Sequence, residues 1–158
     1  MLPLQFAVLA LVAATPSGWP PTAQPGDLSF RPEAKIVDGS LIVTASVRNK
    51  RSTPLMVGFG GCVNHDVVVR LYRSPERKQP AVWESDADGM LCTLQLFRTV
   101  IGPRKSVTLR NLAAKVSGNG VADSVPDATY FATAEICLSD PRITSGEIGV
   151  GTFVVRRH

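Results

Sequence analysis

The amino-acid sequence predicts an all-β protein, an immunoglobulin-like antiparallel β-sandwich of about seven to nine strands. Short segments alternate apolar and polar residues with a period of two, and turn-forming residues separate these segments. No segment shows an amphipathic helical stripe longer than about two turns. The chain of 158 residues is long enough for one domain with a hydrophobic core and too short for two comfortable ones.

The clearest strand covers residues 41–49, where apolar and polar side chains alternate strictly. One face of this strand carries Leu41, Val43, Ala45 and Val47. Further strands are expected at residues 54–59, 67–72, 81–84, 94–101, 106–112, 130–138 and 151–156. Half-buried strands of this kind are typical of a sandwich with one face on the core and one in water.

Tyr130 opens a late strand after a turn, which makes it a candidate for the hydrogen bond of a tyrosine corner. The spacing of Cys, Trp and Cys that marks antibody domains is absent, although Trp83 falls between Cys62 and Cys92. Any likeness to immunoglobulins is therefore expected to be one of architecture.

The N-terminus predicts export. Residues 4–14 form an apolar run of 11 residues, too short for the roughly 20 residues of a spanning helix but typical of a signal peptide. Residues 1–14 are therefore predicted to be a signal peptide, 15–26 a proline-rich linker and 27–158 the sandwich domain. No Lys or Arg precedes the run, so an uncleaved anchor or a buried first strand stays open. The predicted localisation is secreted or periplasmic.

The chain has three cysteines, and an oxidising compartment would allow two of them to pair. Cys62 and Cys92 both lie beside loop signals, and we predict a disulfide between them. Closing that loop stabilises the fold by roughly 3–4 kcal/mol in the chain-entropy model. Cys137 lies within a predicted strand and is expected to stay outside the disulfide and to be partly buried.

The motifs of catalysis and metal binding are missing. The two histidines are His65, in a turn before a predicted strand, and the C-terminal His158, and the sequence has no Gly-x-Ser-x-Gly, HExxH or CxxC motif. Residues 84–89 are weakly similar to a calcium loop, but Gln95 stands where a bidentate Glu should close the site. We therefore expect no catalytic residue, no metal and no cofactor; an enzyme centred on His65 remains the less favoured alternative.

A basic cluster gives the chain its strongest local charge. It consists of Arg70, Arg73, Arg77 and Lys78 in a protein with a formal net charge of +4. Such a cluster can bind an anionic partner, but on the outward side of a strand and in a hairpin connection it is more often a solvated edge. Export further argues against a nucleic-acid partner.

From residue 41 onward the chain resembles the BsuPI-like domain family, which is named for an intracellular proteinase inhibitor. The matching features follow one another in order: the alternating strand that ends in Asn49, the segment from Pro54 to Val57, the Val-rich strand that ends in Tyr72, Val82-Trp83, the turn at Gly102-Pro103, and the late strand that begins with Tyr130. The resemblance covers roughly 115 residues. It implies a sandwich fold and a proteinase-inhibitor-like role.

Together these observations predict an exported protein-binding module without catalytic activity. The expected partner is a protein, either a protease or an envelope protein, with no nucleic acid and no membrane unless the N-terminal segment is retained. Met90 and Leu91, beside Cys92, form the candidate binding loop. The alternative is a structural or cell-envelope assembly domain tethered by its N-terminus.

Overall fold

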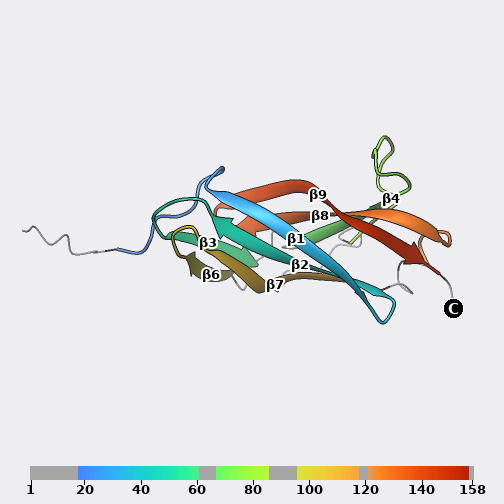
Figure 1. Ribbon diagram of the computed structural model, residues 1–158, viewed down its shortest axis with the longest axis horizontal. Helices are drawn as coiled ribbons and strands as arrows, with labels where there is room; N and C mark the ends of the chain where they lie inside the picture. Colours follow the sequence, from blue (N-terminus) through green and yellow to red (C-terminus); the bar gives the residue numbers. More distant parts are fainter. Residues whose placement is uncertain (1–17, 61–66, 86–95, 118–120, 122, 157–158) are drawn as a thin grey trace, which may run out of the picture.

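The computed structural model describes residues 18–60, 67–85, 96–117, 121 and 123–156. These residues form nine strands: β1 (Leu28–Val37), β2 (Ser40–Asn49), β3 (Leu55–Gly60), β4 (Val67–Tyr72), β5 (Trp83–Glu84), β6 (Leu96–Ile101), β7 (Ser106–Ser117), β8 (Ala128–Ser139) and β9 (Arg142–Val155). Every pair of neighbouring strands is antiparallel (Figure 1).

The strand order is that of an immunoglobulin-like sandwich. The described strands form three sheets, with the orders β1-β2-β7, β3-β6 and β5-β4-β8-β9. A bridge between Gly58 and Asp140 places β3 beside the end of β8, on the side where β4 also lies. β3 and β4 thus occupy the position of strand C, and β6 and β5, which pair with them, that of strand C′. The described strands then correspond to A-B-E and G-F-C-C′, which confirms the predicted fold.

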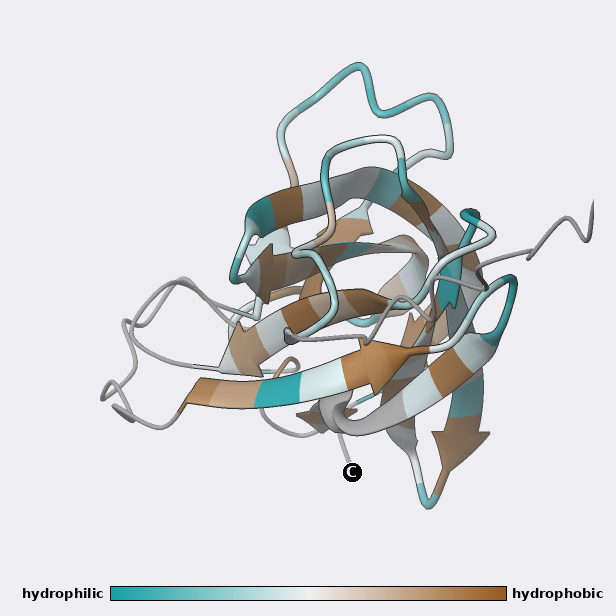
Figure 2. Ribbon diagram, turned by 90° about the vertical axis from the view of Figure 1, so that its left-hand side faces the viewer, coloured by the Kyte–Doolittle hydropathy of each residue, from teal (hydrophilic) through white to brown (hydrophobic). Residues whose placement is uncertain are grey.

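The core lies between these two layers of strands and consists mainly of the alternate residues of β2, β4 and β8. The predicted inward residues of β2 are buried, as are Tyr130, Ala132, Ala134, Ile136 and Leu138 of β8. Apolar and polar positions alternate along the strands, as the end view shows (Figure 2). The period-two pattern therefore predicted the buried faces correctly.

Tyr130 makes the predicted tyrosine corner. Its phenol is 2 % exposed and donates a hydrogen bond of 2.7 Å to the backbone carbonyl of Pro126. The bond ties the start of β8 to the loop that precedes it, which is the role of this residue in immunoglobulin-like domains.

Asn49, at the end of β2, joins two turns from inside the protein. Its side chain is fully buried, and Nδ2 donates to the carbonyls of Thr53 (2.8 Å), Ile101 (3.0 Å) and Gly102 (3.1 Å). Its Oδ1 accepts a 2.7 Å bond from the N–H of Arg51. Asn49 thereby fixes the end of β6 relative to β2.

β1 was not among the strands expected from the sequence. It contains Pro32, and a proline within an apolar run argues against a central strand. β1 tolerates it because, among the described strands, it pairs only with β2, at the edge of its sheet. A two-residue turn joins β1 to β2, and both Asp38 and Gly39 have positive φ, 48° and 70°.

β9 begins nine residues before the predicted strand at residue 151. The part of β9 before residue 151 contains Gly146 and Gly149, and the register of β9 with β8 shifts twice. Gly149 lies against Phe131, and a Cβ at this position would be 3.0 Å from Cζ of that ring. Glycines and bulges obscured the alternation that would have revealed the strand.

The predicted linker at residues 15–26 is partly wrong. Thr22 forms a parallel bridge with Met56 of β3, and Ala23 is fully buried in the core. The domain therefore includes residues that precede the predicted boundary at residue 27.

Asp27 fixes this entry to the domain. Its carboxylate accepts a 2.9 Å bond from the N–H of Gln24 and a 2.7 Å bond from Nε of Arg51. The hydrogen bond from the Gln24 backbone, followed by the bond and charge of Arg51, holds the pKa of Asp27 below its usual range.

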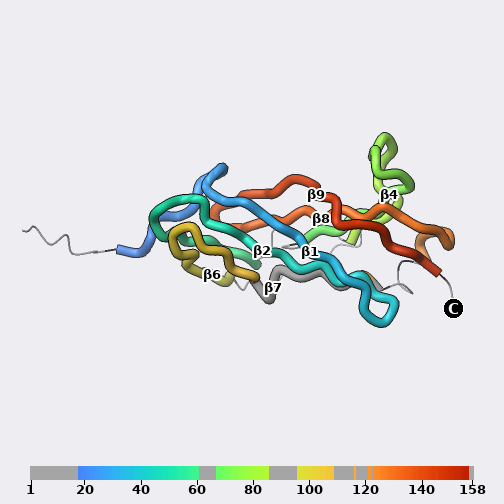
Figure 3. The backbone as a smooth tube through the Cα atoms, viewed as in Figure 1, coloured from blue at the N-terminus to red at the C-terminus, as the bar shows by residue number. Residues whose placement is uncertain are grey.

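Two further features concern the expected elements. β5 is limited to Trp83 and Glu84, and the connection from β4 to β5 stands away from the sheets (Figure 3). Among the described residues, no helix is long and apolar enough to cross a membrane.

Candidate functional site

The residues predicted to form the binding loop and the disulfide cannot be compared with the structure. Met90, Leu91, Cys62 and Cys92 lie outside the described residues, as does His65. Cys137 is described and is half-buried on β8, in agreement with its expected burial. The described residues contain no group of three or more His, Cys, Asp or Glu side chains that could hold a metal ion.

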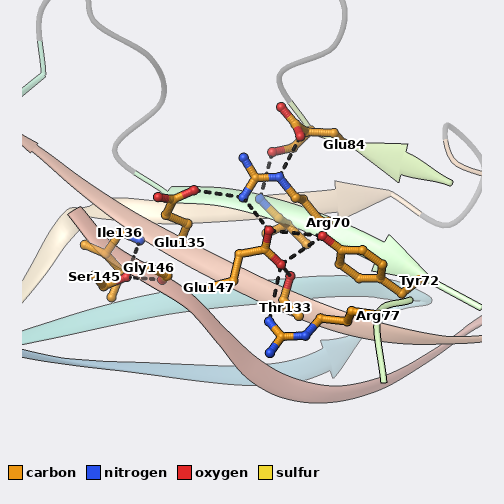
Figure 4. Close-up of polar contacts among 12 residues, drawn as sticks. Arg70, Tyr72, Arg77, Glu84, Thr133, Glu135, Ile136, Ser145, Gly146 and Glu147 are labelled. Atoms are coloured by element: carbon orange, nitrogen blue, oxygen red, sulfur yellow. Dashed lines mark hydrogen bonds and ion pairs between the residues drawn. The ribbon is translucent and has the colours of Figure 1, made fainter. Parts of the chain in front are cut away.

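Three members of the basic cluster, Arg73, Arg77 and Lys78, are exposed, as expected of a solvated edge, whereas Arg70 is not. Arg70 projects from β4 onto the outer face of its sheet, where the side chain is only 19 % exposed. It bonds to Glu84 on β5 (2.6 Å), Glu135 on β8 (2.8 Å) and Glu147 on β9 (3.3 Å) (Figure 4). Burial acts to lower the pKa of Arg70, but the bonds to Glu135 and Glu84 raise it above its ordinary value. One guanidinium thus joins all four strands of this sheet.

Glu147 is the second centre of this network. Besides Arg70, it accepts hydrogen bonds from the Tyr72 phenol (2.9 and 3.0 Å), the Thr133 hydroxyl (3.1 Å) and Arg77 (3.5 Å). Burial, and then the hydrogen bond to Glu147, raise the pKa of Tyr72. The phenol therefore remains a protonated donor at neutral pH.

This network surrounds an open depression lined by Tyr72, Glu76, Arg77, Glu135 and Glu147. Glu135 and Glu147 are both bound by arginines, and the phenol is held protonated. The network has the geometry of a structural brace, because Arg70 bonds to carboxylates on three other strands of the sheet.

A different kind of site lies on β6, at the margin of the molecule (Figure 1). The hydrogen bonds of β3 show which backbone N–H and C=O groups of β6 bond to β3. Met56 directs its N–H and C=O away from β6, to Pro21 (2.9 Å) and Ala23 (3.0 Å). Gly58 likewise exchanges bonds of 2.6 and 3.3 Å with Asp140.

Because the direction of these groups alternates along an antiparallel strand, β3 must meet β6 through Leu55, Val57 and Phe59. Their register partners on β6 are Ile101, Thr99 and Phe97. The remaining residues of β6, Leu96, Arg98 and Val100, therefore turn their N–H and C=O groups toward the other edge. Within the described part of the chain, no strand pairs with that edge.

The side chains along this edge are largely apolar. Leu96 and Val100 point outward and are 41 % and 45 % exposed. Phe97 points to the inner face, stacks on Phe59 with ring centroids 5.7 Å apart, and is still 36 % exposed. The one charged side chain between them, Arg98, is 57 % exposed and bonds to Asp140 at 2.8 and 3.1 Å.

Gly58 makes this ion pair between Arg98 and Asp140 possible. Gly58 lies between Arg98 and Asp140: it is the register partner of Arg98 on β6 and forms a bridge with Asp140. A Cβ at Gly58 would be 2.9 Å from Cβ of Asp140, so only glycine leaves room for the two chains to approach. The Arg98 side chain can then cross above Gly58, and the free edge presents no unneutralised charge.

A partial signal for this site is present in the sequence. Residues 94–101 were expected to form a strand, but pairing partners are not visible in a linear pattern. The alternation of Leu96, Arg98 and Val100 suggests an exposed face, and an edge position follows only from the sheet topology.

The comparisons with known proteins return no match, either among protein-family models or among curated proteins. The resemblance to the BsuPI-like family therefore stays a prediction from the sequence motifs.

Proposed function

We propose that this chain is an exported, non-catalytic protein-binding module that takes up an extended segment of its partner along the free edge of β6. The observation that carries the proposal is the outward direction of the N–H and C=O groups of Leu96, Arg98 and Val100. Edge strands of this kind bind extended peptides through the backbone, while pockets and apolar side chains beside the edge supply specificity.

Two features support recognition at this edge over a passive margin of the sheet. Exposed sheet edges are usually protected by charge, proline or a bulge. Here the strand pairs with β3 without a register shift, and its one charge is held by Asp140. The exposed Leu96, Phe97 and Val100 form an apolar border that a partner strand would cover.

The test removes a single backbone donor at the edge. Arg98→Pro deletes an outward N–H that β3 does not use, whereas the matched control Arg98→Ala keeps the N–H and loses the same ion pair. Random peptides displayed on phage would be selected on the wild-type protein at low concentration. We expect the selected peptides to bind wild type and Arg98→Ala similarly and Arg98→Pro about tenfold more weakly.

Amide hydrogen exchange gives an independent measurement should Arg98→Pro not fold. In the wild-type protein, peptide binding should protect the amides of Leu96, Arg98 and Val100. Equal binding to the two Arg98 variants, or protection confined to other strands, would refute the proposal.

A further inference from the structure

We infer that the edge of β6 pairs with the same strand of a second copy of this chain, across a two-fold axis at Arg98. This inference rests on the proposed function, because it names one partner for the same edge. It follows from a symmetry within the strand. Leu96 and Val100 are equally spaced about Arg98, both are apolar, and all three direct their backbone groups outward.

An antiparallel pair centred on Arg98 places Leu96 opposite Val100 of the second copy, and Arg98 opposite Arg98. In this register the outward groups of one strand meet the outward groups of the other, which gives about six backbone hydrogen bonds. A register shifted by one residue would place the outward N–H and C=O groups of one strand opposite residues whose N–H and C=O groups already bond to β3. The alternation of β6 therefore excludes those registers.

The side chains also match in this register. The apolar pairs of Leu96 with Val100 lie at both ends of the outer face, and Phe97 lies opposite Thr99 on the inner face. Two facing arginines would normally repel one another. Asp140 offsets that repulsion because it forms an ion pair with Arg98 within each copy, while the Arg98 side chain itself stays 57 % exposed.

The symmetry closes the assembly at two copies. A two-fold pair uses the β6 edge of both molecules, and leaves neither available for further growth. An interface of one short strand buries less surface than the roughly 1,200 Å² typical of stable complexes. We therefore expect a weak dimer, with a dissociation constant of about 10 μM.

Cysteine cross-linking tests the register directly. The Cα atoms of a hydrogen-bonded antiparallel pair are about 5.5 Å apart, within the range of a disulfide. Arg98→Cys should therefore give a covalent dimer under oxidising conditions, with a linkage between the two residues 98 shown by peptide mass mapping. The control Leu96→Cys should not, because that residue faces Val100 and not itself.

Sedimentation velocity over a concentration series tests the association itself. We expect wild type and Arg98→Ala to dimerise and Arg98→Pro to remain monomeric. Asp140→Asn should free the two arginine charges at the axis and weaken the dimer about fivefold at low salt, and added salt should reverse most of that loss.

A wild-type chain that stays monomeric at all concentrations, or a dimer that Arg98→Pro leaves unchanged, would overturn the inference. Peptide binding at β6 by a monomeric protein would overturn the dimer alone and leave the proposed function standing. If the wild-type protein neither binds peptides nor dimerises, both the proposed function and the dimer are overturned.

Discussion

Asn49→Ala should destabilise the protein by about 3 kcal/mol, because the polar side chain of Asn49 is fully buried and hydrogen-bonded. The substitution removes the bonds of Nδ2 to three carbonyls and the bond that Oδ1 accepts. Water can reach Thr53 and Arg51, which are exposed, so those groups lose only the net value of a hydrogen bond, about 0.5–1.5 kcal/mol each.

The carbonyl of Ile101 is different, because its bond to Asn49 is buried and Ile101 is 2 % exposed. A buried acceptor that loses its partner costs about 1–3 kcal/mol. For a chain of this size, a loss of about 3 kcal/mol lowers Tm by roughly 6–12 °C.

Urea and thermal unfolding, followed by circular dichroism, would measure this change. Arg48→Ala is the matched control, since Arg48 is the exposed neighbour on the same strand and its loss should change stability by less than about 0.5 kcal/mol. A loss below about 1 kcal/mol for Asn49→Ala would show that water or a local shift satisfies the buried carbonyl, and the reasoning would be refuted. Because Asn49 holds the end of β6, the same variant should also weaken binding at the β6 edge.

Three further predictions follow from single contacts. Tyr130→Phe should cost about 1–2 kcal/mol in urea unfolding, because it removes the 2.7 Å bond to Pro126 and leaves the ring in place; an unchanged midpoint would contradict the tyrosine corner. The lowered pKa of Asp27 means that its ionised form stabilises the fold above the ordinary aspartate pKa, and that this contribution disappears as pH falls through the lowered value. The stability difference between wild type and Asp27→Asn should therefore be greatest near neutral pH and shrink below about pH 4, and a difference independent of pH would refute this. Cys62 and Cys92 belong to the two connections that link the β3–β6 pair to the β4–β5 pair, so non-reducing peptide mapping should find them joined, and a Cys92–Cys137 link would exclude that pairing.

The network of Arg70 and Glu147 and the ion pair of Arg98 and Asp140 have different consequences. Arg70 and Glu147 brace the outer face of β4, β8 and β9, where charges of both signs are matched. Arg98 and Asp140 instead pair the one charge of an edge that is otherwise largely apolar. The first network joins four strands of one sheet, whereas the second offsets the charge at the edge where we propose that another strand binds.

The sequence by itself determined the fold class and most of the buried faces. The alternation in residues 41–49 and 130–138 specified which side chains enter the core, because a strand directs successive side chains to opposite faces whatever its neighbours are. Tyr130 was likewise predictable, since its bond to Pro126 spans only four residues. β1 and the part of β9 before residue 151 escaped detection because Pro32 and the glycines of β9 interrupt the local pattern.

Only the tertiary structure decided what the charged residues do and which edge is open. Arg70 meets Glu135 and Glu147 across 65 and 77 positions of the chain, and Arg98 meets Asp140 across 42. Such contacts depend on the strand order and register, which a linear pattern does not contain. The same holds for the free edge of β6, with which no strand of the described residues pairs, because strand pairing depends on how the domain folds.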